Sequence, residues 1–248
     1  MEAKNVIGAV LITLGAVIGI VGFLNAEVKL TNLGIAGVFL GLVVLTFKSS
    51  EYVKRESVNA LMEPYRRVFS TFADNLYLEG NAVFIPPYEN LPRGGLFVPL
   101  HEKFELDLAR LDEKTVFLTD VPNDRAMGLF LGPFGDSLVE KFEEHFEGPL
   151  DGAGSGAVES VAGSVLRYLE LADRVYIEEK DEGFRVVIRP TIGCKPENCE
   201  KVPCPVCSSV LLALAKGTGQ VLAVESIEEK DYGIEATVRK LGGVEEWM

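Results

Sequence analysis

The chain has 248 residues, of which 48% are hydrophobic and 25% are charged, and its formal net charge is −13. This composition is typical of a folded protein and excludes a disordered one. Residues 49–248 contain 21 basic and 35 acidic side chains. We therefore expect no nucleic-acid partner, because an acidic surface and a phosphate backbone repel each other.

Two apolar runs open the chain. The first, Asn5 to Leu24, is twenty residues long and contains no ionisable group. An α-helix of that length spans about 30 Å, which is the thickness of the hydrocarbon core of a bilayer. The second run, from Leu33 to Phe47, is shorter, and neighbouring apolar residues can extend it. The pattern excludes an ordinary soluble enzyme and predicts that residues 1–48 are a two-helix anchor in the lipid bilayer.

Basic residues are distributed unevenly around the second run. Only Lys29 lies in the connection between the two runs, whereas five basic residues follow the second one: Lys48, Lys54, Arg55, Arg66 and Arg67. Cytoplasmic segments next to a membrane span are enriched in Lys and Arg. The sequence therefore predicts a two-span protein of the cell membrane whose large domain is cytoplasmic.

Glycines recur every seven residues in both runs, at Gly8, Gly15 and Gly22 and again at Gly34 and Gly41. Small residues on one face let two membrane helices approach closely. We expect these faces to pack the two spans against each other. Formation of a homo-oligomer through the same Gly-rich faces is the alternative.

An amphipathic helix is predicted after the anchor, because Leu61, Tyr65, Val68, Phe72 and Leu76 follow helical spacing. Short apolar and β-branched runs follow it between turns rich in Pro and Gly. These runs predict the strands of a meander-like sheet, at residues 82–85, 96–100, 116–121 and 127–131. Ser137 and Glu140 then form a capping-box pattern at the start of another helix.

The same order of elements occurs twice after the flexible segment 151–156. A helix around residues 158–172 precedes a hairpin at 174–189, and a helix around 205–216 precedes a hairpin at 220–240. Two such units predict a four-stranded antiparallel sheet with both helices on one face.

The predicted fold class is therefore α+β: an N-terminal transmembrane helical hairpin followed by a cytoplasmic antiparallel-sheet domain with helices packed on it. We expect three parts. They are the anchor (1–48), a linker helix with an α+β subdomain (49–150), and a helix-hairpin-helix-hairpin α+β subdomain with the cysteine cluster (151–248).

All four cysteines of the chain lie within fourteen residues, as Cys194, Cys199, Cys204 and Cys207 in CKPENCEKVPCPVC. Four thiolates are the ligand set of a structural zinc ion, and a CxxC turn supplies two of them from one loop. Zinc is the only cofactor that we expect, with these four residues as its ligands. Lys195 and Lys201 would offset part of the negative charge of such a centre.

Other chemistry is compatible with the same residues. The chain has a single glutamine and 27 glutamates, a composition that resembles thermophile proteins. Thermophiles also use intracellular disulfides, so two disulfide bonds are an alternative to zinc. A redox pair at Cys204 and Cys207, next to a helix start, and an iron–sulfur cluster are further alternatives.

The segment CPVCSSVLLALAKGTGQVLAVESIEEKDYGIEATV resembles the last third of 4-vinyl-reductase-type domains, with Cys204, Cys207, Glu225 and Gly233 at matching positions. The two spans, together with RGGLFVPLHEKFEL, GLFLGPFGDSLVEKFE and PVCSSVLLALAKGTG, are similar to a family of uncharacterised archaeal two-span membrane proteins. The first resemblance implies a regulatory module that binds a small molecule or a metal.

These observations predict a membrane-anchored domain that binds a ligand or a protein partner and contains a structural four-cysteine site. Whether it is an enzyme is left open, and no catalytic residue is predicted. One alternative is a membrane-linked thiol–disulfide oxidoreductase with Cys204 as nucleophile and Cys207 as resolving thiol. The other alternative is a non-catalytic scaffold for assembly at the membrane.

Overall fold

The computed structural model describes residues 2–46, 54–192, 194 and 199–248. The chain divides into two compact units, Met1–Lys54 and Arg55–Met248. The first unit is helical, and the second combines helices with one sheet. The α+β class predicted from the sequence is therefore confirmed.

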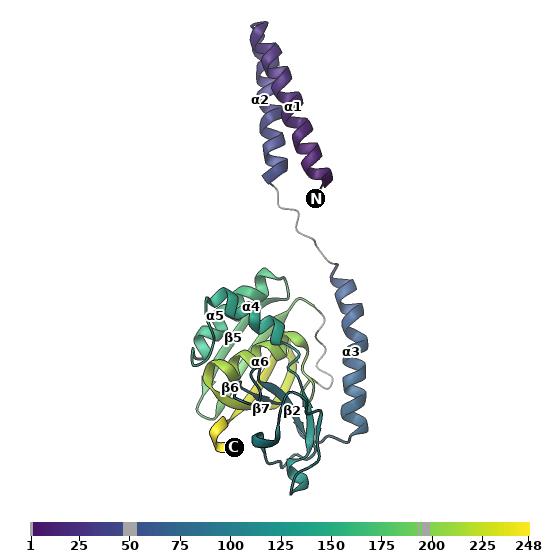
Figure 1. Ribbon diagram of the computed structural model, residues 1–248, viewed down its shortest axis with the longest axis vertical. Helices are drawn as coiled ribbons and strands as arrows, with labels where there is room; N and C mark the ends of the chain where they lie inside the picture. Colours follow the sequence, from purple (N-terminus) through teal and green to yellow (C-terminus); the bar gives the residue numbers. More distant parts are fainter. Residues whose placement is uncertain (1, 47–53, 193, 195–198) are drawn as a thin grey trace. The chain divides into compact units, whose positions relative to one another are not determined.

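The first unit is a helical hairpin of α1 (Glu2–Leu24) and α2 (Val28–Thr46), which lie side by side (Figure 1). Residues Asn5–Leu24 and Val28–Thr46 are long and apolar enough to cross a membrane. Glycine brings the two backbones into contact, since a Cβ at Gly15 would lie 2.6 Å from the backbone N of Val38. The predicted packing of the two helices through their glycines is observed. Association of two copies remains a prediction.

The described residues of the second unit form four α-helices: α3 (Arg55–Asn75), α4 (Asp136–Phe146), α5 (Ser155–Tyr168) and α6 (Pro205–Thr218). Its eight strands are β1 (Val83–Ile85), β2 (Gly95–Pro99), β3 (Phe117–Leu118), β4 (Gly128–Leu131), β5 (Ala172–Lys180), β6 (Gly183–Pro190), β7 (Gln220–Lys230) and β8 (Gly233–Gly243). Three short 3-10 helices complete it: η1 (Leu108–Arg110), η2 (Asp124–Ala126) and η3 (Val244–Trp247).

All eight strands form one antiparallel sheet in the order β3-β4-β2-β1-β7-β8-β6-β5. The hairpins β5–β6 and β7–β8 are paired as the repeat predicted, and β6 lies against β8. The predicted four-stranded sheet is half of the whole, because β1 pairs with β7 through Val83 and Ala223. Strands from both predicted subdomains thus share one sheet, and the boundary between residues 150 and 151 remains a prediction.

The helices α4, α5 and α6 lie over one face of the sheet (Figure 1). Their apolar residues and the inward side chains of β5 to β8 form the largest core cluster. On the opposite face, a second cluster that includes Phe97, Phe130 and Leu108 covers the half of the sheet built from β1, β2 and β4. The other half has polar outward residues, such as Arg185 paired with Glu235 at 2.5 Å, as expected for an antiparallel sheet with one solvated face.

The predicted capping box of α4 is wrong. Gly135 is the N-cap and makes no side-chain capping bond, and the carboxylate of Asp136 accepts a hydrogen bond from the backbone N of Ser137 at 2.7 Å. Gly135 is required there because α4 meets the backbone of α6. A Cβ at Gly135 would overlap the backbone N and Cα of Ser209.

The helix α3 is confirmed, with Pro64 inside it. Of the predicted apolar stripe, Leu76 packs against the core just after the helix, whereas the other four residues are largely exposed. Burial of Ala73 beside Leu78 and β2 fixes the rotation of the helix. The residue four positions earlier, Phe69, therefore packs edge-on against Phe134 with ring centroids 4.6 Å apart. The stripe points away, and its residues are 50–68% exposed: Leu61, Tyr65, Val68 and Phe72.

The contact between α4 and α6 predicts a difference between two glycines. Gly135→Ala should lower the free energy of unfolding by about 1–3 kcal/mol, because the new methyl group has to displace a buried backbone. Gly132→Ala is the matched control, since a Cβ there meets no described atom within 4 Å. Denaturant unfolding of the full chain in detergent, followed by Trp247 fluorescence, measures both. Equal stability of the two variants would contradict this packing.

Candidate metal centre

The four cysteines come together where the connection after β6 meets the first turn of α6. The Sγ atoms of Cys194, Cys204 and Cys207 all lie within 4.8 Å of one another. The Sγ of Cys194 is 3.8 Å from that of Cys207 and 4.0 Å from that of Cys199. The structure thus collects three thiols at metal-binding distance, with the fourth in contact with one of them.

The CxxC segment forms the start of α6. Cys204 is the N-cap, and its Sγ accepts a hydrogen bond from the backbone N of Cys207 at 3.5 Å. Pro205 occupies the first turn, where its missing N–H costs nothing and its fixed φ favours the helix. Helix geometry therefore holds the side chains of Cys204 and Cys207 on the same side of the first turn.

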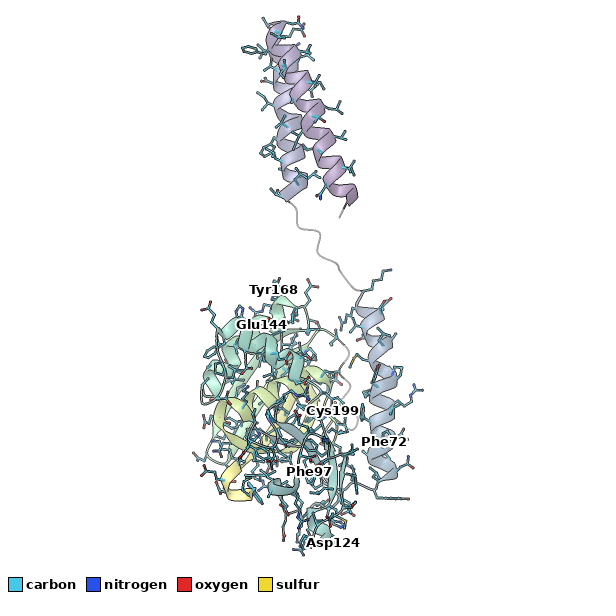
Figure 2. All side chains as sticks on the ribbon, viewed as in Figure 1. Phe72, Phe97, Asp124, Glu144, Tyr168 and Cys199 are labelled. Atoms are coloured by element: carbon cyan, nitrogen blue, oxygen red, sulfur yellow. The ribbon has the colours of Figure 1, made fainter. Side chains whose placement is uncertain are left out.

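The cluster is largely shielded from solvent. Cys199 and Cys207 are buried, whereas Cys194 and Cys204 are partly exposed. Figure 2 labels Cys199 on the side of the domain that is next to α3. Cys194 and Cys204 are therefore the members of the cluster nearest the surface, and the other two are held by packing.

Hydrogen bonds between the thiols separate their pKa values. The pKa of Cys194 is raised, because its thiol is hydrogen-bonded to Cys199, Cys204 and Cys207 and keeps its proton. The pKa of Cys204 is held well below its usual range by the bonds from Cys194 and Cys207 and by the backbone N–H groups of the helix start. Hydrogen bonding from Cys194 also lowers the pKa of Cys199, and Arg66 acts in the same direction.

The residues between the cysteines connect the cluster to distant parts of the chain. The carbonyl of Glu200 accepts a hydrogen bond from the backbone N of Ala82 at 2.8 Å, next to β1. Lys201 Nζ donates to the carbonyl of Leu78 at 2.6 Å, just after α3. Lys201 is thus engaged by a backbone oxygen, which we did not predict, and Lys195 lies outside the described residues.

The arrangement suits a metal ion better than a disulfide. Four sulfurs at 2.3 Å from a tetrahedral ion are separated by about 3.8 Å. The distances from Cys194 to Cys207 and to Cys199 are close to this value, at 3.8 and 4.0 Å. A disulfide requires an S–S bond of about 2.05 Å, and all four cysteines are free thiols in this structure.

Two polar groupings elsewhere in the domain were not predicted in this form. His101 lies 3.4 Å from Glu79 and 3.9 Å from Asp124, in an exposed cluster assembled from three segments. Lys216 on α6 is only 15% exposed and contacts Glu143 at 2.7 Å. It borders an open hollow of about 380 Å³ that also includes Asp151 and Glu245. Sequence spacing did not predict Glu79 and Asp124 as neighbours of His101, or Glu143 as the neighbour of Lys216, because these residues are far apart in the chain.

Two neighbouring buried residues of α6 should respond differently to substitution. Cys207→Ser should lower the free energy of unfolding by about 2–5 kcal/mol, because the cluster loses one of its cross-linking sulfurs. Ser208→Ala should leave it unchanged within about 1 kcal/mol or raise it, since Ser208 Oγ is buried without a hydrogen-bond partner among the described residues.

Thermal and denaturant unfolding under reducing conditions measure both variants of this pair. Serine at position 207 keeps the size of the side chain and removes only the sulfur chemistry. An unchanged melting temperature for Cys207→Ser would show that the cluster does not stabilise the fold.

The fold and the cluster together define the class of protein: an α+β domain with a multi-thiol cluster, preceded by two helices long and apolar enough to cross a membrane. The chain belongs to the family described as Domain of unknown function (DUF7982), whose model matches residues 3–239. The match thus includes nearly all of the hairpin, the sheet except the end of β8, and all four cysteines. No curated protein and no solved structure matches the chain. The archaeal origin and the likeness to 4-vinyl-reductase-type domains remain predictions.

Proposed function

We propose that this protein is a membrane-anchored binding module whose cytoplasmic domain is stabilised by one zinc ion bound to Cys194, Cys199, Cys204 and Cys207. The observation that carries the proposal is the convergence of Cys194, Cys204 and Cys207 within 4.8 Å. Cys199, 4.0 Å from Cys194, would complete the ligand set. Zinc supplies no redox chemistry, so its role here is to hold the loop between β6 and α6.

A structural role fits the position of the cluster in the fold. The loop that contains Glu200 and Lys201 is hydrogen-bonded to the segment between α3 and β1. A bound ion would therefore fix the end of β6, the start of α6 and the entry to β1 at one point. The domain would then act by presenting a surface to a ligand or protein partner, and the hollow beside Lys216 is a candidate for the ligand.

Zinc content of the reduced protein tests the metal centre. We expect one zinc per chain by elemental analysis of the full chain purified with a thiol reductant. Cys204→Ser should lose most of this metal, because a structural zinc site needs all four ligands. Ser208→Ala, at a neighbouring buried position, should keep it.

Metal-free protein with two disulfides would refute the zinc proposal and leave a structural role for the cysteines. Metal-free protein in which iodoacetamide labels Cys204 rapidly, with an unchanged melting temperature of Cys204→Ser, would favour the thiol–disulfide oxidoreductase instead.

The orientation is tested by a reporter enzyme that is active only outside the cytoplasm. Fused after Met248, it should be inactive, because five basic residues follow α2, whereas the opposite end of the hairpin has only Lys29, in the first turn of α2. Inserted in the connection at Ala26, the same reporter should be active. The reverse pattern would place the domain outside the cell.

A further inference from the structure

Four large apolar side chains of α3 form an exposed stripe: Leu61, Tyr65, Val68 and Phe72. Each of these side chains is at least half exposed. Their spacing of four, three and four residues places them on one side of the helix. Figure 2 shows Phe72 on α3, which stands beside the rest of the domain.

The residues through which α3 contacts the rest of the domain are different from the four residues of the stripe. Phe69 contacts Phe134, and Ala73 packs in the cluster around Leu78, which Leu76 also joins just after the end of the helix. At 100° per residue, Phe69 and Ala73 lie roughly a quarter of a turn or more from the centre of the stripe. The helix can therefore remain docked on the domain while the stripe binds something else.

The charges of α3 are arranged around the stripe. Its three acidic residues, Glu56, Glu63 and Asp74, all lie roughly opposite the centre of the stripe. The residues that border it, such as Ser57, Pro64 and Asn75, are uncharged. No carboxylate of α3 itself therefore has to be desolvated or brought near anionic headgroups when this side of the helix approaches a lipid surface.

The distribution of charge along the chain also favours α3 as the part of the domain that approaches the membrane. Residues 49–75 contain four basic and four acidic residues, whereas residues 76–248 contain 17 basic and 31 acidic ones. An anionic bilayer surface therefore repels most of the domain and tolerates α3. Tyr65 and Phe72 are also of the aromatic type that is found at the membrane interface.

Eight residues separate the end of α2 from the start of α3. Even fully extended, eight residues reach only about 29 Å. If α1 and α2 cross a bilayer, the start of α3 is always within this distance of its surface. The effective concentration of lipid at the stripe is then high, so that a small apolar contact suffices for binding.

We propose that the stripe of α3 docks in the headgroup–acyl boundary of the bilayer that α1 and α2 span. The apolar side chains enter this boundary, and the side of α3 that contacts the domain stays outside it. The inference rests on the proposed membrane anchoring. It adds a second, peripheral contact that restricts how the domain stands on the membrane.

Lipid quenching of a single tryptophan tests the docking. The full chain with Trp247→Phe has no tryptophan, and Tyr65→Trp then introduces one in the stripe. In vesicles of equal parts phosphatidylcholine and phosphatidylglycerol, this stripe tryptophan should shift to shorter emission wavelength and lose most of its intensity when the acyl chains are brominated. Tyr168→Trp in the same background is the matched control, because Tyr168 is a similarly exposed tyrosine away from the stripe, and its tryptophan should be unaffected.

A second variant shows whether the apolar contact is responsible. Leu61→Glu with Val68→Glu should abolish the quenching of the stripe tryptophan, while the protein stays in the vesicles after an alkaline wash. An unquenched stripe tryptophan in washed vesicles of the Tyr65→Trp protein would refute the docking and leave the anchor intact. Release of the chain by the wash would refute both. Emission that depends on the protein-to-lipid ratio, without quenching, would show that a second copy covers the stripe and would also overturn the inference.

Discussion

Burial of α6 over most of its length is the constraint on which the rest of the domain depends. Eleven of its fourteen residues are buried, and most of these are apolar. Such a helix has to be surrounded, and here the sheet lies beneath it and α4 and α5 lie beside it. The close contact at Gly135 shows how tightly α4 is held. The position of α6 in turn determines where Cys204 and Cys207 lie, because they form its first turn.

The cysteine cluster is best understood as a junction between parts of the fold that are remote in sequence. Cys194 follows β6, Cys207 belongs to α6, and the backbone between the cysteines pairs with Ala82 at the entry to β1. A cross-link at this point restrains three elements at once, which a single hydrophobic contact does not do. It also lies near α3, since Arg66 influences the pKa of Cys199. A metal at this position would stabilise the junction between the end of α3, β1 and α6.

The two faces of helix α3 have different surroundings. One face joins the domain through Phe69 and Ala73, and the other presents an apolar stripe. Four large apolar side chains exposed to water do not stabilise a soluble domain, and such patches favour association with other molecules. The strongly acidic sheet domain and the uncharged border of the stripe fit a protein that approaches lipid with one helix only.

The sequence alone determined the elements of this protein. Runs of uncharged residues predicted α1 and α2, and alternating apolar residues between turns predicted the hairpins β5–β6 and β7–β8. The short spacing of the four cysteines identified them as one cluster. These signals are local in the sequence, so they can be recognised without the structure. Only the tertiary structure decided how the elements combine. Pairing of Val83 with Ala223 extends the predicted four-stranded sheet to eight strands, and burial of Ala73 sets which face of α3 is free. Contacts between residues so far apart depend on the packing of the whole core, and no local spacing encodes them.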